Sequence, residues 1–282
     1  DIRETVASPE AVLQIFRDSK SLFTPAAVLK HTQQLFEGTV SRGVFITQKA
    51  GGVNETALRE ALAETVKPDD QVRLAEGPPV SFETLPVIGK PANVAQTSDT
   101  GLLGIQKLSF ANGVNALLWP VQEEPGRVTV KVRFGGGYRE IAPKDAAYVT
   151  LGQMALVGAG VATLGQDDLD RISTGRKMGF EFNIEDAAFE FKAETRPADL
   201  ADQLYLFAAK LDLPRWDIAP FDRAKAAAKI QYHTFATSPQ GVLNRDLQFY
   251  QRGQDPRFKT PTPEDIDKTD AQGFQRVWGK AL

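Results

Sequence analysis

The chain has 282 residues, of which 42% are hydrophobic and 24% are charged. This length and this apolar content suffice for one or two packed cores, and they exclude a disordered chain. The net charge of −3 is too small for the basic field that nucleic acid or an anionic membrane requires, so neither is expected as a partner. Since the sequence contains no Cys, disulfides, Cys-ligated zinc and thiol catalysis are excluded.

The two ends of the sequence carry no natural boundary signals. The chain starts at Asp1 without an initiator Met or a signal-like segment, and it stops at Leu282 inside a helical pattern that has no cap. We therefore expect a fragment of a longer precursor.

The first part of the chain alternates helical patterns with one short strand pattern. Four Ser-Pro or Thr-Pro pairs predict helix starts, because the hydroxyl accepts an N–H of the first turn and Pro at the next position has no N–H to leave unpaired. They are Ser8-Pro9, Thr24-Pro25, Ser238-Pro239 and Thr262-Pro263. Behind Thr24, the apolar side chains at 28, 29, 35 and 36 fall on one helical face. Residues 41–48 predict a strand around Val44, and residues 54–66 predict a helix whose inward side chains are Leu58, Ala61, Leu62 and Val66.

Residues 75–104 lose this periodicity and are rich in Pro and Gly, which is typical of a linker that lies along a surface. The predicted domain boundary falls here. Residues 1–86 form the first part, 87–103 the linker and 104–282 the second domain.

The second domain opens on strand patterns. Residues 107–111 and 115–119 flank Asn112-Gly113, a strong hairpin signal, and apolar residues alternate with polar ones over 128–134. Helical patterns over 144–157 and 167–177 follow, then strands at 180–184 and 189–195. The chain finishes in helices, the clearest at 197–211. This order predicts an α+β fold in which one antiparallel sheet holds all these strands and the helices pack on one face. The expected inward residues are Val130, Val132, Phe182, Phe189, Phe191, Leu204 and Phe207.

A search for catalytic patterns leaves no assigned site. His31 and His233 lie about two hundred residues apart, and neither has a Glu or a second His at helical spacing, so both are interpreted as structural or surface residues. The run Gly135-Gly136-Gly137 lacks the rest of a phosphate loop and is interpreted as a turn. Acidic pairs at 167–168 and 264–265 fit the first turns of helices, where the dipole favours them. The sequence has no G-x-S-x-G, and the basic residues of 221–236 predict a solvated helix face.

An ordered series of motifs runs from about residue 104 to 282. A hairpin through Asn112-Gly113 leads to Trp119-Pro120, then to the strand at 128–134, the Gly run and Arg139-Glu140. A Gly-Thr loop at 158–163, two Phe-rich strands, paired helices and the helix start at 262–265 follow in the same order. This series resembles a domain of the insulinase/pitrilysin family of zinc metallopeptidases, which implies a LuxS/metallohydrolase-like repeat. The first part, to about residue 86, resembles the end of a preceding domain of that family.

The family places its zinc-binding HxxEH on the helix after the Arg-Glu pair. Here that helix is 146–154, which contains no His and no Glu, and the basic helix at 221–236 lacks the further glutamate ligand. The resemblance therefore implies a non-catalytic repeat. No catalytic, cofactor-binding or metal-binding residue is assigned, and zinc is expected only in a catalytic repeat of the parent protein.

The function implied by the resemblance is that of an inactive part of a zinc peptidase. Such a part forms wall and interface of the chamber that encloses an unfolded peptide. Its partners would be the catalytic half, in the same protein or in a partner subunit, and the peptide itself. The parent would be bacterial and periplasmic, or otherwise cytoplasmic. The alternative is a non-peptidase scaffold or assembly subunit derived from the same family.

A last expectation concerns the end of the chain. The family continues its last helix into a strand that completes the sheet, so an open sheet edge is expected here. Self-association, or a strand formed by Val80-Ser81-Phe82, would cover that edge. The side chains of Phe274, Val277 and Trp278 would lack part of their packing.

Overall fold

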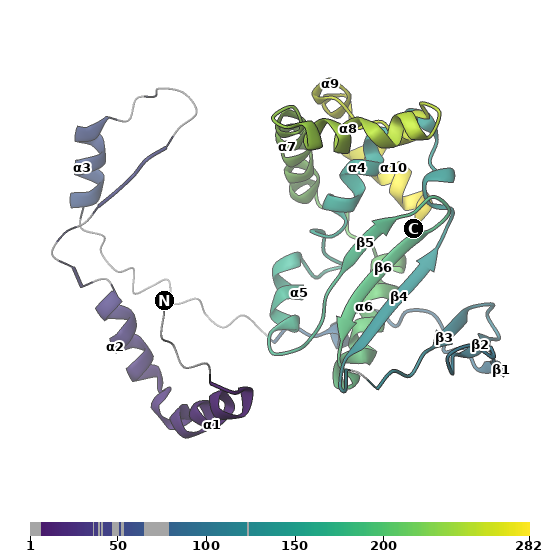
Figure 1. The fold of residues 1–282 in the computed structure, drawn as a ribbon, viewed down its shortest axis with the longest axis horizontal. Coiled ribbons are helices and arrows are strands. Elements are labelled where there is room, and N and C mark those ends of the chain that lie inside the picture. Colours follow the sequence, from purple (N-terminus) through teal and green to yellow (C-terminus); the bar gives the residue numbers. More distant parts are fainter. Residues whose placement is uncertain are drawn as a thin grey trace. The chain divides into compact units, whose positions relative to one another are not determined.

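A computed structural model describes residues 7–35, 37–38, 40, 42–46, 51, 54–64, 79–122 and 124–282. The chain divides into two compact units, Asp1–Ala75 and Glu76–Leu282 (Figure 1).

The described part of the first unit consists of short helices without a buried side chain. They are α1 (Pro9–Ser19), a 3-10 turn (Lys20–Leu22), α2 (Pro25–Leu35) and α3 (Glu55–Ala63). The predicted caps are confirmed, since the Ser8 hydroxyl accepts from the N–H of Ala11 at 3.2 Å and the Thr24 hydroxyl from that of Ala27 at 3.2 Å. Of the side chains expected to face inward in 54–66, Ala61 and Leu62 are exposed and Leu58 is half-buried. Phe36 and Val66 lie outside the described residues.

The strand predicted at 41–48 is wrong for residues 42–46, which have no regular structure. Val44 and Ile46 are exposed, and Gly43 lies against the side chains of Leu58 and Leu62 in α3. A strand pattern needs a neighbouring strand for its N–H and C=O groups, and none pairs with 42–46 in the described part of this unit. The remaining residues of the prediction, 41 and 47–48, lie outside the described ones.

The second unit contains two antiparallel three-stranded sheets. The first has the order β1-β2-β3, formed by Val94–Asp99, Gln106–Phe110 and Asn115–Leu118. The second has the order β4-β6-β5, in which β4 is Val128–Phe134, β5 is Glu181–Ile184 and β6 is Phe189–Thr195. The α+β class and the predicted strands are confirmed.

The expectation that all these strands share one sheet is wrong. Strand β2 pairs with β3 on one side and with β1 on the other, so both of its edges are already occupied. The partner β1 comes from residues 94–99, which were predicted to be linker. Polar residues such as Gln96 and Ser98 hid this strand, because a strand exposed on both faces has no apolar alternation.

Helices complete the second unit (Figure 1). The α-helices are α4 (Ala146–Ala155), α5 (Gln166–Ser173), α6 (Leu200–Asp212), α7 (Ile218–Phe235), α8 (Pro239–Gln251), α9 (Pro263–Asp267) and α10 (Ala271–Ala281). Short 3-10 helices cover Phe82–Thr84, Gly137–Arg139, Pro143–Asp145, Pro197–Asp199 and Pro256–Phe258. No helix in the described part of the chain is both long and apolar enough to cross a bilayer.

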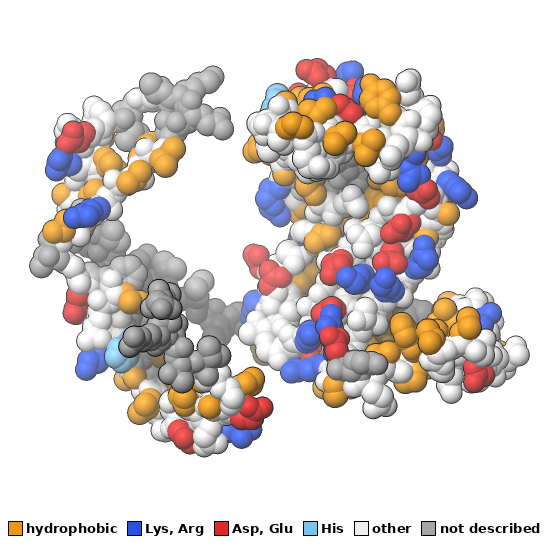
Figure 2. Space-filling view, in the orientation of Figure 1, with side chains coloured by type: hydrophobic (Ala, Val, Ile, Leu, Met, Phe, Trp, Pro, Cys, Tyr) orange, Lys and Arg blue, Asp and Glu red, His pale blue; other side chains and the backbone are white. Residues whose placement is uncertain are grey.

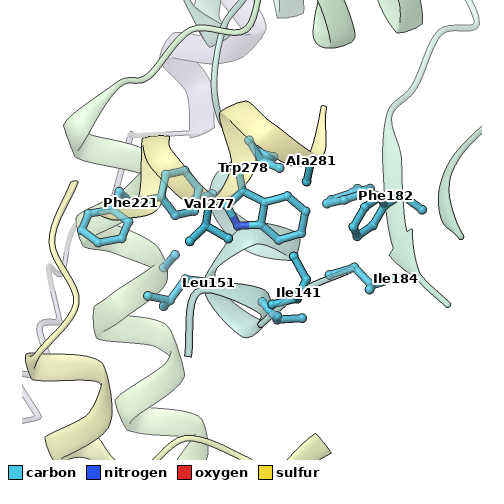
Figure 3. Packing of buried hydrophobic residues seen from close by; sticks show 14 of the residues in the cluster. Ile141, Leu151, Phe182, Ile184, Phe221, Val277, Trp278 and Ala281 are labelled. Atoms are coloured by element: carbon cyan, nitrogen blue, oxygen red, sulfur yellow. The ribbon is translucent and has the colours of Figure 1, made fainter. Parts of the chain in front are cut away.

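The main core lies between the β4-β6-β5 sheet and the helices α4, α6, α7 and α10 (Figure 3). Phe182, Phe189, Phe191 and Phe207 are buried as predicted, and Val130 and Val132 are half-buried against them. The buried indole of Trp278 meets the rings of Phe182 and Phe189, with centroids 5.3 and 5.6 Å away. Since Phe274 and Val277 are buried as well, the expectation of missing packing around α10 is wrong.

The prediction that Leu204 faces inward is also wrong, because its exposed fraction is 45%. Its neighbour Gln203 is fully buried instead. The Gln203 amide accepts from the N–H of Gly179 and donates to the carbonyl of Gly179, both at 2.9 Å. These two hydrogen bonds pair the buried Gln203 amide with the half-buried backbone of Gly179, and a leucine at position 203 could make neither of them.

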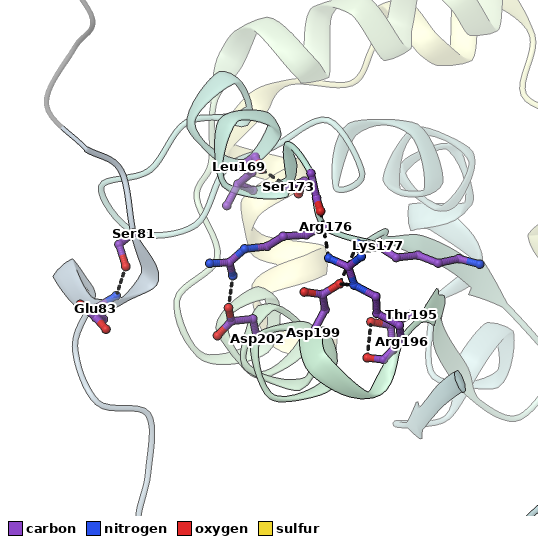
Figure 4. A network of polar contacts seen from close by, with 11 residues as sticks. Ser81, Glu83, Leu169, Ser173, Arg176, Lys177, Thr195, Arg196, Asp199 and Asp202 are labelled. Carbon is purple, nitrogen blue, oxygen red and sulfur yellow. Dashed lines mark hydrogen bonds and ion pairs between the residues drawn. The ribbon is translucent and has the colours of Figure 1, made fainter. Parts of the chain in front are cut away.

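A polar network next to Gln203 holds the chain before β5 against the start of α6 (Figure 4). The buried carboxylate of Asp199 accepts from the N–H of Lys177 at 2.9 Å and from Arg196 Nε at 2.5 Å. The hydrogen bond from the Lys177 backbone and the pair with Arg196 lower the pKa of Asp199. Arg176 forms an ion pair with Asp202 in α6. Local and distant contacts therefore both fix the position of α6.

Residues 79–88 were predicted to belong to the first part and the linker, but they pack onto the second unit. Phe82 and Leu85 are buried in a second apolar cluster with Leu206 and other residues. The Phe82 ring contacts that of Tyr205 at 5.2 Å, and the Tyr205 hydroxyl donates to the carbonyl of Pro86 at 3.0 Å. The idea that Val80-Ser81-Phe82 adds a strand is wrong, since a 3-10 helix starts at Phe82.

Candidate functional site

The Gly run after β4 forms a tight turn against the β5–β6 turn, as the sequence predicted. Gly135 and Gly137 have φ of +60° and +59°, a conformation that other residues avoid. The backbone of Glu185 and Ala188 occupies the space of a Cβ at Gly137, and the Tyr138 N–H donates to the Glu185 carbonyl at 3.0 Å. This contact sets the direction in which the chain enters α4.

Helix α4 is the element to which the resemblance assigns a zinc site. Its buried residues are Val149, Leu151, Gly152 and Ala155, and it packs on α7, whose buried residues are Pro220, Phe221, Ala224 and Ala228. Apolar side chains offer no lone pair to Zn²⁺, whose usual ligands are imidazole, thiolate and carboxylate. The residues present therefore do not fit a zinc site. In the described part of the chain, no group of three or more His, Cys, Asp or Glu side chains is arranged to hold a metal ion.

The basic face of α7 was predicted to be solvated, but part of it contacts other elements of the same unit. Lys225 Nζ donates to the carbonyl of Thr269 at 2.7 Å, and Lys229 forms an ion pair with Asp267. Both contacts fasten α7 to α9 and the turn behind it. Lys225 and Lys229 are therefore engaged within the unit, whereas Arg223 is exposed.

The two histidines lie in separate units and both are exposed. His31 in α2 makes a hydrogen bond to Gln34 at 3.0 Å, and His233 lies near the end of α7. The predicted capping carboxylates are confirmed, since Asp168 accepts from the Gly165 N–H at 3.0 Å and Asp265 from that of Thr262 at 3.2 Å. None of these groups contributes to a shared site.

Lys210 is a buried cation that the sequence analysis missed. Its exposed fraction is 5%, and its Nζ donates to the carbonyls of Leu156 and Ala159 at 3.0 and 2.5 Å. The Nζ also lies 4.6 Å from the centre of the Phe180 ring. Burial lowers the pKa of Lys210 to about 8. The sequence signal was a lysine within the apolar stretch of α6, which could have been interpreted as a buried group with backbone partners.

A polar cleft of about 340 Å³ is the other notable feature of the second unit. It lies between the β5–β6 turn, α8 and residues 257–260, and Tyr138 and Thr150 also line it. Its cationic lining residues are Arg245, Arg252, Arg257 and Lys259, and its carboxylates are Glu185 and Asp186. No motif in the sequence predicted the cleft, because its residues come from positions 138 to 260.

Comparison with known proteins connects this geometry to a family of folds. No family model and no curated protein sequence matches the chain. Among solved structures, the ferredoxin protease FusC, as an E83A mutant in complex with Arabidopsis ferredoxin, aligns over 80% of this chain and 24% of its own, with TM-score 0.58 and 16% identity. The periplasmic protease PqqL of Escherichia coli aligns over 94% of this chain and 25% of its own, with TM-score 0.57 and 14% identity.

A third structure is the inactive domain of an M16 peptidase from Pseudomonas fluorescens. It aligns over 62% of this chain and 43% of its own, with TM-score 0.53 and 17% identity. The fold is M16-like. The resemblance to the insulinase/pitrilysin (M16) peptidases is thereby confirmed at the level of the fold. The chain spans about a quarter of the length of FusC and PqqL.

Proposed function

We propose that the chain is a non-catalytic segment of an M16-type zinc peptidase and forms wall and interface of a peptide-enclosing chamber. The zinc would be held by a catalytic half, in the same protein or in a partner subunit. The observation that carries this proposal is an M16-like fold whose α4–α7 contact is apolar where the resemblance places zinc ligands. Without imidazole or carboxylate groups there, neither the metal nor a base for its bound water has a place.

The outer face of the β4-β6-β5 sheet suits a chamber wall. Glu190 lies 3.8 Å from both Lys131 and Arg133, and Lys192 lies 3.3 Å from Glu181. Such a face of mutually neutralised charges stays hydrated and exposes little apolar surface to a passing chain (Figure 2). It therefore favours an aqueous interior over a tight protein contact.

The β1-β2-β3 sheet suits an interface. None of its strand residues is buried, and the register places Leu108, Phe110, Ala116 and Leu118 on one face. Hydrophobic side chains gather over this sheet in Figure 2. Leu118 is exposed and the other three are half-buried, and an apolar face of this kind that is open to solvent is typical of a surface that another domain covers. The first unit, whose apolar side chains are exposed, supports the same idea and its assignment to the end of a preceding domain.

The relatives support a protein substrate and a bacterial compartment for the parent. FusC was solved with a protein, ferredoxin, and PqqL is a periplasmic protease. We infer the periplasm for this chain. Cell fractionation of the native host tests this location. Recovery of the chain in the cytoplasmic fraction would contradict it.

The function is tested by reconstitution. The chain is expressed alone and together with the HxxEH-bearing polypeptide of the same gene or a neighbouring gene. We expect no stoichiometric zinc and no peptide cleavage by the chain alone, and chelator-sensitive cleavage by a 1:1 complex. About one tightly bound Zn²⁺ per chain, or cleavage by the partner that does not change when the chain is omitted, would contradict the proposal. A stable complex without any cleavage would favour a scaffold.

A further inference from the structure

We propose that the cleft between the β5–β6 turn, α8 and residues 257–260 binds carboxylate groups of a peptide, and so selects acidic segments. This inference rests on the proposed function, since it takes a peptide to be the ligand of the cleft. The volume of about 340 Å³ lies at the lower end of the range of ligand sites. The ligand that fits the cleft depends on which of its polar groups are already paired.

The acidic groups around the cleft are largely neutralised. Asp246 pairs with Arg245 through two hydrogen bonds of 2.8 and 2.7 Å, and Asp186 lies 2.5 Å from Arg252. Asp255 pairs with Arg257 through contacts of 2.5 to 3.0 Å. Two-point pairing of this kind fixes the plane of a guanidinium, and each guanidinium carries five N–H donors. The pairs therefore hold the arginines in place without exhausting their donors.

The polar groups of the cleft that remain without a hydrogen-bond partner are mainly donors. Arg245 Nη1 and Arg252 Nη2 have no hydrogen-bond partner among the described residues. The side-chain oxygens of Asn244 and Gln248 already accept, from Gln240 and Arg252, and so their NH₂ groups remain. A ligand rich in acceptors complements this lining, and a carboxylate is the strongest such acceptor in a peptide.

Two charged side chains in the cleft make no hydrogen bond or ion pair within the described part of the chain. They are Lys259, on the segment 257–260, and Glu185, on the β5–β6 turn. Lys259 would attract a carboxylate, and Glu185 would repel it. The two residues therefore predict opposite effects on the same ligand.

The cleft is also held rigid. The guanidinium of Arg252 lies 4.2 Å from the centre of the Phe258 ring, and Phe258 contacts Tyr138 with ring centroids 4.6 Å apart. Thr260 donates to the carbonyl of Arg245 at 2.7 Å, which ties the segment 257–260 to α8. A preorganised lining loses little conformational entropy when a ligand binds.

The test measures peptide binding by the full chain with fluorescence anisotropy. The probe is a labelled, unstructured peptide of Asp, Glu, Gly and Ser, and its control carries Asn and Gln in place of Asp and Glu. We expect the acidic peptide to bind about tenfold more tightly, with a difference that shrinks as salt screens exposed charges. Lys259→Gln should weaken binding of the acidic peptide by about two- to fivefold, and Glu185→Gln should strengthen it by a similar factor.

Lys107→Gln, an exposed lysine in β2, serves as the matched control and should change neither affinity. Thermal unfolding of each variant checks that the fold is intact. Equal affinity for both peptides would contradict carboxylate binding by the cleft, and so would affinities that do not change in the Lys259 and Glu185 variants. Neither result would contradict the proposed role as a chamber wall. If the chain binds neither peptide, the cleft is not a peptide site, and the part of the proposed function in which the chain contacts the peptide is also contradicted.

Discussion

The indole of Trp278 in α10 lies directly against the α-carbon of Gly152 in α4. A Cβ at Gly152 would overlap the six-membered ring of this indole. The indole Nε1 donates to the carbonyl of Tyr148 at 2.8 Å, and the Tyr148 hydroxyl in turn occupies the space of a Cβ at Gly273 in α10. Each helix therefore provides a glycine for an aromatic side chain of the other. This contact joins α10 to α4.

The Gly152–Trp278 contact predicts that any larger residue at position 152 clashes with the indole. Gly152→Ala should lower the free energy of unfolding by about 1–3 kcal/mol, because Phe182 and Phe189 behind the indole leave it no room to move. Urea unfolding followed by Trp fluorescence measures this. Gly158→Ala is the control, since the nearest atom to its added Cβ is 3.7 Å away, and it should be close to neutral. Equal effects at both positions would contradict the packing described.

Because Gln203 is buried and Leu204 is exposed, a substitution of the polar residue should cost more stability than one of the apolar residue. Gln203→Leu should destabilise the protein by about 1–3 kcal/mol, because it leaves the half-buried N–H and carbonyl of Gly179 without their partner. Leu204→Gln should change stability by less than about 0.5 kcal/mol, because this side chain is exposed. Chemical denaturation of both variants decides the matter. A larger loss at 204 than at 203 would show that the sequence-based orientation of α6 was right.

Lys210 predicts a pH dependence of stability. Its pKa is about 8 in the folded protein and 10.5 in the unfolded chain, so between these values the unfolded state binds more protons. Raising the pH from 8 to 10.5 should therefore stabilise the fold, by up to about 1.4 kcal/mol per pH unit, and this gain is lost as the pH falls through 8. The neutral amine still has two N–H groups for the carbonyls of Leu156 and Ala159.

Lys210→Met removes this titration. As the pH rises from 8 to 10, the unfolding free energy of the wild type should increase relative to that of the variant. Urea unfolding at several pH values measures it. A difference that stays constant over this range would mean that Lys210 titrates at its ordinary pKa.

The docking of residues 79–88 predicts that they contribute to the stability of the second unit. Phe82→Ala should cost about 2–4 kcal/mol, because the ring is buried against Tyr205 and the cluster around Leu206. Val87→Ala, at a side chain that is 90% exposed, is the control and should have no measurable effect. If both variants unfold like the wild type, residues 79–88 are the linker that their composition suggested.

The sequence by itself determined the local structure of this protein. Hydroxyl caps at Ser8, Thr24, Ser238 and Thr262, and the alternation of residues 128–134, depend on atoms a few residues apart. A short series of residues can therefore specify them. The order of these elements was also enough to indicate the M16-like fold.

Tertiary structure decided what depends on distant partners. Strand β1 exists because β2 offers it an edge, and Gln203 turns inward because the backbone of Gly179 needs its amide. Lys210 is buried because the carbonyls of Leu156 and Ala159, which follow α4, accept hydrogen bonds from its Nζ. The polar cleft joins side chains more than a hundred positions apart. Periodicity reports only how apolar a position is, whereas a buried polar group is placed by partners that the chain brings together when it folds.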